Sequence, residues 1–386
     1  MSPSQRMGKN LLGLAVQHRK QMPPTPPGRL AKEVMQTLAQ NLSNGVSKDL
    51  VGMQLSLTNM QALGFPDIDK TSRKFAVTNY LGEGGHFVTV EVVEEGSSKK
   101  QAMKLFTLTT GSRVKLGFLG RQLARATGIE RILDETTAML QAAGNTKLSE
   151  AMASRGLLLA SGVASIQGVP SVMECPSAYL INEVILMDSL SGDLLGLFAA
   201  RNPLPLEIKE YAAKRVLLIA MHLQRANFSH NNFSLENIFA REDGSFFLGE
   251  FGAGTPIGKP LERVRDVTVK YADKDLAAAA MEGRRTAQVV RPIADGKSDM
   301  WALGMCLYGI FTGGRRPYGL ANSEKAAEEL QALAREKVDA KALRKQLSAA
   351  KVPLNWQGLI VDLLQVERAN RSDVVTLIGK YVDLIY

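Results

Sequence analysis

The pattern of apolar and polar positions divides the chain into a strand-rich first part and a helical second part. Residues 74–95 alternate around a glycine cluster, KFAVTNYLGEGGHFVTVEVVEE, and this alternation predicts a β-hairpin. Residues 99–108 predict a further strand, and residues 178–190 predict one or two buried strands. Between them, residues 121–142 place apolar side chains at helical spacing.

Helices dominate the chain from about residue 197 onward. Residues 207–226, EIKEYAAKRVLLIAMHLQRA, and residues 298–313, SDMWALGMCLYGIFTG, predict two long helices. The second is apolar on every side, so we expect it to be buried. Strands followed by helices are typical of an α+β fold with two lobes.

The region before the hairpin has a different composition. Residues 21–30, QMPPTPPGRL, predict a proline-rich linker, and residues 31–42 predict an amphipathic helix. The basic stretch at 6–20 favours either a helix on a membrane surface or a disordered tail, and it lacks the apolar core of a secretory signal. The expected organisation is a tail and linker at 1–28, an N-terminal extension at 29–75, an N-lobe at 76–187 and a C-lobe at 188–386.

Composition limits the possible classes of protein but does not indicate a function. The chain has 386 residues, of which 45% are apolar, and this is enough for one large two-lobed domain. Its formal net charge of +9 favours acidic partners. Cys175 and Cys306 match neither a metal site nor a disulfide framework, so two buried free thiols are expected. No apolar run approaches the length of a membrane span.

Six short motifs occur in one order over about 300 residues. Each motif alone is weak, and their order and spacing carry the weight. Together they resemble the signature set of protein kinases, and the resemblance covers most of the chain. They are LGEGGHF at 81–87, QAMK at 101–104, HNNFSLENIF at 230–239, EFG at 250–252, SDMWALG at 298–304, and Arg371.

The resemblance implies a kinase-like fold, with a β-rich N-lobe, an α-helical C-lobe and an N-terminal extension. In the N-lobe, Gly82 and Gly84 would let backbone N–H groups approach nucleotide phosphates. Phe87 replaces the third glycine of the motif and would crowd the phosphate site. Lys104 would contact the phosphates and pair with a helix carboxylate, for which Glu135 is the first candidate and Glu130 the second.

The resemblance also assigns roles around the loop at 230–239. His230 would be a hydrogen-bonded structural residue. Asn232 stands where kinases carry the catalytic Asp, and Ser234 stands where a Lys is common. Asn237 and Glu250 occupy the metal-binding positions, although Glu250 is longer than the usual Asp and would strain Mg²⁺ coordination.

Three further residues would hold the helical lobe together. Asp299, at the start of the apolar helix, would accept hydrogen bonds from the backbone of the 230–239 loop. Arg371 would form an ion pair with an acidic residue in YADKDLA, and Asp275 is the expected partner.

Two segments sharpen the resemblance to the rhoptry kinase family of apicomplexan parasites. These are H-x-x-F-x-x-x-N-[LI]-F at 230–239 and D-G-x-x-x-L-G-[DE] at 243–250. Several members of that family are pseudokinases. The resemblance implies secretion from rhoptries into the host cell or its parasitophorous vacuole, and protein partners such as an active kinase or a host protein. We expect no nucleic-acid partner.

Two functions stay open. The replacements at Asn232, Ser234 and Glu250 predict a pseudokinase that acts as a scaffold or allosteric regulator, because loss of a positioned base costs about 10²–10⁴ in rate. The alternative is an atypical active phosphotransferase that uses Lys104, Asn237 and Glu250 with a divalent metal. For either function, we expect ATP with Mg²⁺ or Mn²⁺ to be a weak ligand or to be absent. Contact of residues 6–20 with a membrane surface is a further expectation.

Overall fold

The computed structural model describes residues 50–84, 87–109, 117–144, 147–168, 170–174, 178–199, 204–241, 244–286, 291–336 and 340–385. The predicted tail, linker and helix before residue 50, with the expected membrane contact at 6–20, lie outside these residues, as does Cys175. The described chain forms two compact units. The sheet unit runs to residue 140 and resumes at 158–190, and the helical unit comprises 141–157 and the chain from 191 onward.

Both unit boundaries differ from the predicted ones. The main division follows Leu190, close to the expected end of the N-lobe at 187. Residues 141–157, however, belong to the helical unit, although the sequence analysis placed them in the N-lobe. The reason is that Gly156 and Leu157 lie against the helical unit: the Gly156 carbonyl accepts a hydrogen bond from Leu248 N at 2.8 Å.

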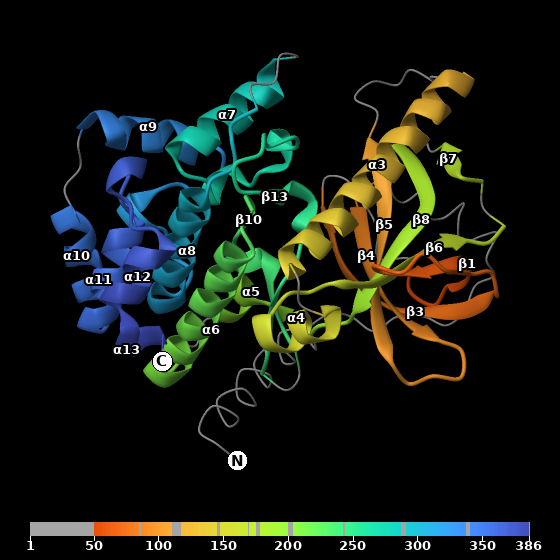
Figure 1. The fold of residues 1–386 in the computed structure, drawn as a ribbon, viewed down its shortest axis with the longest axis horizontal. Coiled ribbons are helices and arrows are strands. Elements are labelled where there is room, and N and C mark those ends of the chain that lie inside the picture. The colour runs from red at the N-terminus through yellow and green to blue at the C-terminus, as the bar shows by residue number, and fades with distance from the viewer. Residues whose placement is uncertain are drawn as a thin grey trace. The chain divides into compact units, whose positions relative to one another are not determined.

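The sheet unit is built on one antiparallel sheet, shown in orange to yellow-green in Figure 1. Its strands follow the order β2-β1-β3-β4-β5-β8-β6, and β7 pairs with β8. Their bounds are β1 Gln54–Ala62, β2 Ile68–Asp69, β3 Arg73–Gly84, β4 Phe87–Glu94, β5 Lys100–Thr109, β6 Ala160–Ile166, β7 Val172–Glu174 and β8 Ala178–Asp188. The β3–β4 hairpin, the β5 strand and the β8 strand confirm the predictions for residues 74–95, 99–108 and 178–190.

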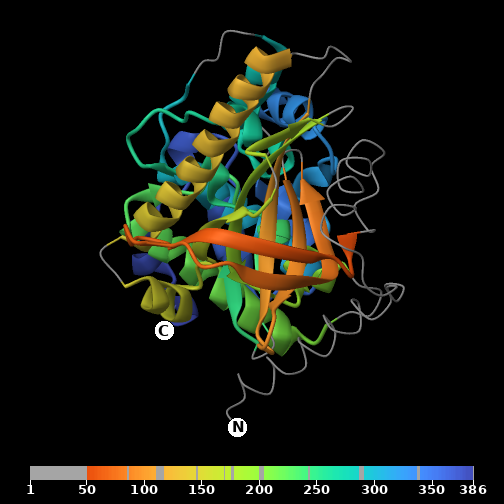
Figure 2. The ribbon, with the colours of Figure 1, turned by 90° about the vertical axis from the view of Figure 1, so that its right-hand side faces the viewer.

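The sheet closes on itself because β1 pairs with both β3 and β6. In Figure 2, β1 (red-orange) faces the viewer and runs across the strands behind it. Closure removes the unpaired edges that an open sheet would expose. Leu50, Met53, Leu55 and Leu57 are buried in the core inside this sheet. Residues 50–62 are therefore part of the sheet unit itself, a role that the predicted N-terminal extension did not include.

One long helix, α3 (Gly117–Ala143), accompanies the sheet and confirms the helix predicted at 121–142. Its described part buries Ile132, Glu135 and Met139. Met139 also contacts the sheet, where its sulfur accepts a hydrogen bond from Ala160 N at 3.3 Å. The burial of a carboxylate at Glu135 on this apolar face calls for a partner charge.

The helical unit, yellow at α4 and green to blue from α5 onward in Figure 1, contains the remaining helices and several short strands. The helices are α4 Leu148–Arg155, α5 Leu194–Phe198, α6 Leu206–Arg225, α7 Lys274–Arg285, α8 Gly296–Thr312, α9 Ala326–Glu336, α10 Ala340–Ala349, α11 Leu354–Leu363, α12 Val374–Lys380 and α13 Val382–Ile385. The short strands are β9 Gly192–Asp193, β10 Phe228–Ser229, β11 Ile238–Ala240, β12 Phe246–Leu248 and β13 Thr255–Pro256. Among the described helices, none is both long and apolar enough to cross a bilayer.

Helix α8 is the centre of this unit, as its all-round apolar sequence predicts. Every residue from Ser298 to Phe311 is buried, including the free thiol of Cys306. The helix begins with Asp295 as N-cap, whose side chain accepts from Lys297 N, and it ends at Gly313 with φ 72°. It packs against α6 and α11. Its buried first turn positions the site described next.

Candidate functional site

The loop that begins at His230 is anchored to the first turn of α8. Asp299 accepts hydrogen bonds from the backbone N–H groups of His230 at 2.6 Å and of Asn231 at 2.9 Å. Asp299 is 1% exposed, and its burial raises the pKa to about 6 although these two bonds favour the charged form. The predicted contact between Asp299 and the loop backbone is therefore confirmed.

His230 is a structural residue in the geometry found. Its Nε2–H donates to the Gly249 carbonyl at 2.9 Å, and the side chain is fully buried. Its ring meets Phe251 edge-on, with centroids 5.1 Å apart. Burial lowers the pKa of His230 to about 4, so the ring is neutral at physiological pH. His230 thus joins the loop to the segment that carries Glu250.

Asn231 makes a second link between these segments, and sequence reasoning missed it. Its backbone has φ 58°, a left-handed conformation that Asn tolerates better than most residues. Its Nδ2 donates to the Ser229 carbonyl at 3.2 Å and to the Ala253 carbonyl at 3.1 Å. The sequence signal available for this link was the amide residue Asn231 directly after His230.

Asn232, at the position of the catalytic Asp, accepts hydrogen bonds at both its side chain and its backbone carbonyl. Its Oδ1 accepts a hydrogen bond from Thr268 N at 3.1 Å, and its carbonyl accepts one from Asn237 Nδ2 at 2.8 Å. A cavity of about 10 Å³, the space of one water molecule, lies beside Asn232 and Thr268. Ser234 is buried at the start of the short helical turn Leu235–Asn237. Neither residue supplies an ionisable group near neutral pH.

Of the two residues at metal-binding positions, Asn237 lies within this loop and Glu250 follows it in sequence. Asn237 donates through its amide nitrogen, which leaves its amide oxygen as the atom suited to a cation. Glu250 has φ 63° and ψ 60°, a left-handed conformation that is strained for a residue other than Gly, Asn or Asp. An amide oxygen and a carboxylate are donors that Mg²⁺ accepts. In the described residues, no three His, Cys, Asp or Glu side chains gather as metal ligands.

In the sheet unit, Lys104 forms the ion pair that the sequence predicts. Its ammonium lies 2.7 and 2.9 Å from the two carboxylate oxygens of Glu135, and both side chains are buried. Glu130, the second candidate, is exposed on the same helix. The choice of Glu135 over Glu130 is therefore confirmed, and the pair brings the middle of β5 onto α3.

Phe87 covers the ammonium of Lys104. The Lys104 Nζ lies 4.0 Å from the centroid of the Phe87 ring and 5.6 Å from that of Phe106. Phe87 is the cross-strand partner of Phe106 and stands at the third glycine position of the motif. Together with Glu135, the two rings enclose the cation, which leaves Lys104 only 2% exposed.

The two predicted phosphate-loop glycines lie at the end of β3. At Gly82 a Cβ would meet nothing within 4 Å, so the local structure does not require glycine there. Gly84 pairs with Phe87 across the hairpin. Space is thus open beside Gly82, whereas the Lys104 cation is covered by Phe87.

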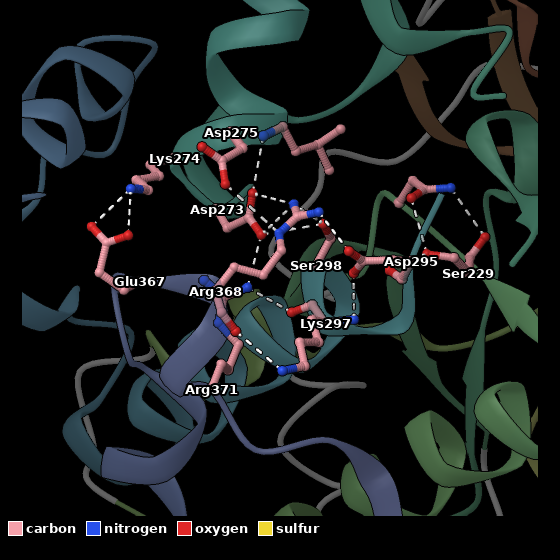
Figure 3. Close-up of polar contacts among 12 residues, drawn as sticks. Ser229, Asp273, Lys274, Asp275, Asp295, Lys297, Ser298, Glu367, Arg368 and Arg371 are labelled. Atoms are coloured by element: carbon pink, nitrogen blue, oxygen red, sulfur yellow. Dashed lines mark hydrogen bonds and ion pairs between the residues drawn. The ribbon is translucent and has the colours of Figure 1, made fainter. Parts of the chain in front are cut away.

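The partner of Arg371 is Asp273, and the predicted partner Asp275 is wrong. Arg371 Nη1 lies 2.7 Å from Asp273 Oδ2, and both side chains are fully buried (Figure 3). Asp273 is the N-cap of α7 and accepts from Leu276 N at 2.9 Å, so its side chain turns inward. Asp275 lies one residue inside the helix, is half exposed, and approaches Arg368 at 3.7 Å.

Arg368 completes a buried cluster with the same carboxylate. It donates to Asp273 at 2.8 Å, to Asp295 at 2.6 Å and to Ser298 Oγ at 2.8 Å (Figure 3). Burial opposes the charge of Asp273, but the guanidinium groups of Arg371 and Arg368 more than offset it and hold the Asp273 pKa below its ordinary value. This cluster ties α7, the start of α8 and the segment before α12 together.

Comparison with known proteins agrees with the fold and with the order of the motifs. A family model described as kinase-like matches residues 68–371, well over half of the chain. The chain belongs to the kinase-like family. The Lys104–Glu135 pair, the loop anchored by Asp299 and the Asp273–Arg371 pair lie within the matched residues.

Solved structures of rhoptry kinases share this fold. The ROP18 kinase domain in complex with AMP-PNP and sucrose has 15% sequence identity and a TM-score of 0.65, covering 100% of this chain and 95% of that chain. ROP2 from Toxoplasma gondii, described as a virulence factor with a protein-kinase fold and no enzymatic activity, has 13% identity and a TM-score of 0.67, covering 100% and 96%. A rhoptry antigen kinase domain specific to Toxoplasma gondii has 14% identity and a TM-score of 0.66, covering 100% and 97%.

Proposed function

We propose that this chain is a pseudokinase, a kinase-like protein that is catalytically impaired and acts by binding other proteins. The observation that carries the proposal is the chemistry and hydrogen bonding of the Asn232 side chain. Its side chain is an amide, which cannot take up the proton of a substrate hydroxyl, and its oxygen is already bonded to Thr268 N. Loss of a positioned base costs about 10²–10⁴ in rate.

The surroundings of Lys104 support the same proposal. A phosphate that approaches this cation must displace Phe87, whose ring lies 4.0 Å from the ammonium. It must also compete with Glu135, which holds the ammonium through both carboxylate oxygens. A cation–aromatic contact of a desolvated ammonium contributes about 2 kcal/mol, so nucleotide binding would be weakened.

The intact framework supports a binding role. Asp299, His230 and the Asp273–Arg371 cluster keep the helical unit ordered around a loop that lacks its ionisable groups. We propose, from the resemblance of the 230–239 and 243–250 segments to rhoptry kinases, that the protein is secreted to the parasitophorous vacuole or host cell. Its partner there would be an active kinase or a host protein.

The test is a calorimetric titration of ATP, alone and with Mg²⁺ or Mn²⁺, followed by an assay of phosphotransfer and autophosphorylation. We expect weak or no ATP binding, and no transfer by the wild type. Phe87→Gly should strengthen ATP binding, because it uncovers Lys104, and Lys104→Met should abolish what binding there is. Turnover by the wild type that Lys104→Met removes would overturn the proposal.

A second function is favoured by one observation, the intact Lys104–Glu135 ion pair. An atypical phosphotransferase would use Lys104 for the phosphates, with Asn237 and Glu250 as ligands of Mg²⁺ or Mn²⁺. The metal would supply charge neutralisation at the transferred phosphate. The variant Asn232→Asp separates the two: a pseudokinase that lacks only its base gains turnover, whereas an atypical enzyme is already active without the change.

A further inference from the structure

A buried tyrosine ring in the helical unit has two cations beside it. Tyr271, the last residue of the short helical turn Val269–Tyr271, is 5% exposed. The guanidinium carbon of Arg316 lies 4.6 Å from the centroid of the Tyr271 ring, and the Lys270 ammonium lies 5.9 Å from it. The same ammonium lies 2.5 Å from Oε1 of Glu236. We call Glu236, Lys270, Tyr271 and Arg316 the Tyr271 cluster.

The Tyr271 cluster borders the loop of the candidate site. Glu236 directly precedes Asn237, one of the two residues at metal-binding positions. Lys270 follows by two residues Thr268, whose backbone N–H donates to the side chain of Asn232. All of these residues belong to the helical unit. The cluster therefore lies next to the loop whose ionisable groups are missing, and no step proposed so far uses it.

The turn that carries Arg316 has an unusual backbone. Four residues of the turn 313–319 have φ between 57° and 79°: Gly313, Gly314, Tyr318 and Gly319. A tyrosine in this left-handed region is strained, and such strain persists only where the surroundings fix the residue. The Tyr318 hydroxyl donates to the Leu364 carbonyl at 2.8 Å, and its backbone N–H donates to Gln346 Oε1 at 3.3 Å. The position of Arg316 is thus set by a turn that is itself held from two sides.

The positive charge of the Tyr271 cluster exceeds its negative charge. Glu236 is its one carboxylate and faces two cations, of which the guanidinium keeps its proton at any physiological pH. Burial raises the pKa of Tyr271 far above its ordinary value, and Cys306 and Glu236 raise it further, so the hydroxyl is neutral. Arg316 Nε and Nη2 are inaccessible to solvent and have no hydrogen-bond partner among the described residues. A charged group in this state favours an additional acceptor nearby.

The elements packed against the cluster supply no second carboxylate. Helices α7, α8 and α9 contact the turn Val269–Tyr271. Carboxylates on these helices bind elsewhere: Asp275, Glu282, Asp299 and Glu329. Within the described part of the chain, Glu236 is the only carboxylate in an ion pair with Lys270, and none forms an ion pair with Arg316. One positive charge of the cluster is therefore left without a counter-charge.

We propose that the Tyr271 cluster is a docking site for an acidic segment of a partner protein, which binds through Lys270 and Arg316. The inference rests on the proposed function and names the chemistry of its protein partner. A guanidinium offers forked N–H donors that fit a carboxylate. The Lys270 side chain is 25% exposed and the neighbouring Arg315 is exposed, so the charge reaches the surface. A basic segment would meet these cations and a carboxylate that is already paired.

The first experiment titrates the full chain into fluorescein-labelled hexaglutamate and follows the fluorescence anisotropy, with hexalysine carrying the same label as reference. We expect saturable binding of hexaglutamate that weakens as the salt concentration rises, and no binding of hexalysine. A chain with a net charge of +9 also attracts acidic peptides without a defined site. Variants of equal charge are therefore needed to locate the binding.

The variant Lys270→Gln/Arg316→Gln should weaken hexaglutamate binding at least about tenfold, because it removes both cations of the cluster. The matched control is Lys345→Gln/Arg335→Gln, which removes one exposed lysine from α10 and one exposed arginine from α9. It should weaken binding less than about twofold. Melting temperatures check that each variant folds. If the first variant does not fold, Lys270→Gln replaces it with Lys345→Gln as control, and a loss of about threefold is expected.

The opposite change gives a sharper test. Glu236→Gln removes the carboxylate that competes for the two cations, so hexaglutamate should bind about three- to tenfold more tightly. Glu328→Gln, at an exposed position of α9, raises the net charge by the same amount and should change the affinity less than about twofold. A structural role of the cluster predicts no gain in Glu236→Gln beyond that of Glu328→Gln.

Two results would overturn this docking site. One is hexaglutamate binding that is absent or no stronger than hexalysine binding. The other is an equal affinity in the members of each matched pair, which would assign the binding to the net charge alone. Neither result bears on catalysis: phosphotransfer by the wild type would overturn the proposed function, whereas a failed peptide titration without phosphotransfer would overturn only the docking site.

Discussion

Among the described residues, each unit has an ion pair in which both side chains are deeply buried, and the two pairs differ in what surrounds the cation. In the helical unit, Arg371 donates to Asp273 and also to the carbonyls of Lys297, Gln365 and Val366. In the sheet unit, the ammonium of Lys104 faces Glu135 and the ring of Phe87. The arginine is held by backbone carbonyls as well as by its carboxylate, whereas the rings of Phe87 and Phe106 cover the lysine beside its carboxylate.

The difference separates a cation fixed between chain segments from one covered by side chains. A guanidinium bonded to Asp273, to the Lys297 carbonyl and to the adjacent carbonyls of Gln365 and Val366 links three chain segments and leaves little freedom for a ligand. The Lys104 ammonium lies nearer to Phe87 than to Phe106, so a change of the Phe87 side chain would uncover it most. This chain contains both pairs, and access to Lys104 depends on Phe87.

The largest expected effect is the loss of the Asp273 charge. Asp273→Asn keeps an N-cap for α7 but leaves the buried Arg371 and half-buried Arg368 without their carboxylate. We expect the free energy of unfolding to fall by about 3–5 kcal/mol, since an arginine cannot escape by losing its proton. Chemical denaturation measures it. Asp275→Asn is the control, and its half-exposed carboxylate should matter by less than about 1 kcal/mol.

An equal loss in the two variants would contradict the assignment of Asp273 as the partner of Arg371. A loss confined to Asp275→Asn would restore the partner expected from the sequence.

The second effect concerns the sheet unit and should be smaller. Glu135→Gln leaves the Lys104 ammonium buried without a counter-charge, but a lysine can respond by releasing its proton. We expect the free energy of unfolding to fall by about 2–3 kcal/mol. Glu130→Gln on the exposed side of α3 should change it by less than about 0.5 kcal/mol. A loss as large as that of Asp273→Asn would mean that the lysine is held as tightly as the arginine.

Much of this arrangement could be predicted from the sequence. The all-round apolar pattern of α8 and the alternation of the β3–β4 hairpin follow directly from side-chain periodicity, and the spacing of the motifs placed Lys104 opposite Glu135. Glu135 is preferred to Glu130 because residues 132, 135 and 139 share the buried face of α3.

Two features could not be derived in that way. Asp273 and Asp275 are two residues apart, and the choice between them depends on which one is the N-cap, a boundary that periodicity locates only to within a few residues. Strand β1 closes the sheet by pairing with β6, about a hundred residues later, and no local pattern encodes a pairing of that range. The alternation in QLSLTNMQA was the available signal for the strand alone.

A third prediction compares how two buried groups of the helical unit, His230 and Asp299, change the stability of the fold with pH. The His230 pKa is about 4 in the fold and 6.5 ordinarily, so its contribution is present above pH 6.5 and is lost as pH falls toward 4. The Asp299 pKa is about 6 and ordinarily 3.8, so the fold gains stability as pH falls from 6 to 3.8. The two effects oppose each other and are of similar size, about 3 kcal/mol each.

His230→Gln should unmask the contribution of Asp299. Urea denaturation between pH 7 and pH 4.5 should show the variant gaining stability relative to the wild type as the pH falls, by about 2–3 kcal/mol in total. Asp299→Asn is the counterpart and should change the slope in the opposite direction. Parallel pH profiles of the wild type and His230→Gln would show that folding does not lower the His230 pKa.

The smallest expected effect tests the strain at Glu250. This residue has φ 63°, where Asp is tolerated better than Glu, so Glu250→Asp should raise the free energy of unfolding by about 0.5–1 kcal/mol. Lys351→Asn provides the reference, because Lys351 is exposed, has φ 56° and lies far in sequence from the kinase motifs. Equal gains in the two variants would mean that Glu250 is simply strained. A more stable Lys351→Asn variant with a less stable Glu250→Asp variant would mean that the longer carboxylate of Glu250 makes contacts that compensate for its backbone strain. The Glu at the position of the usual Asp would then stabilise this site.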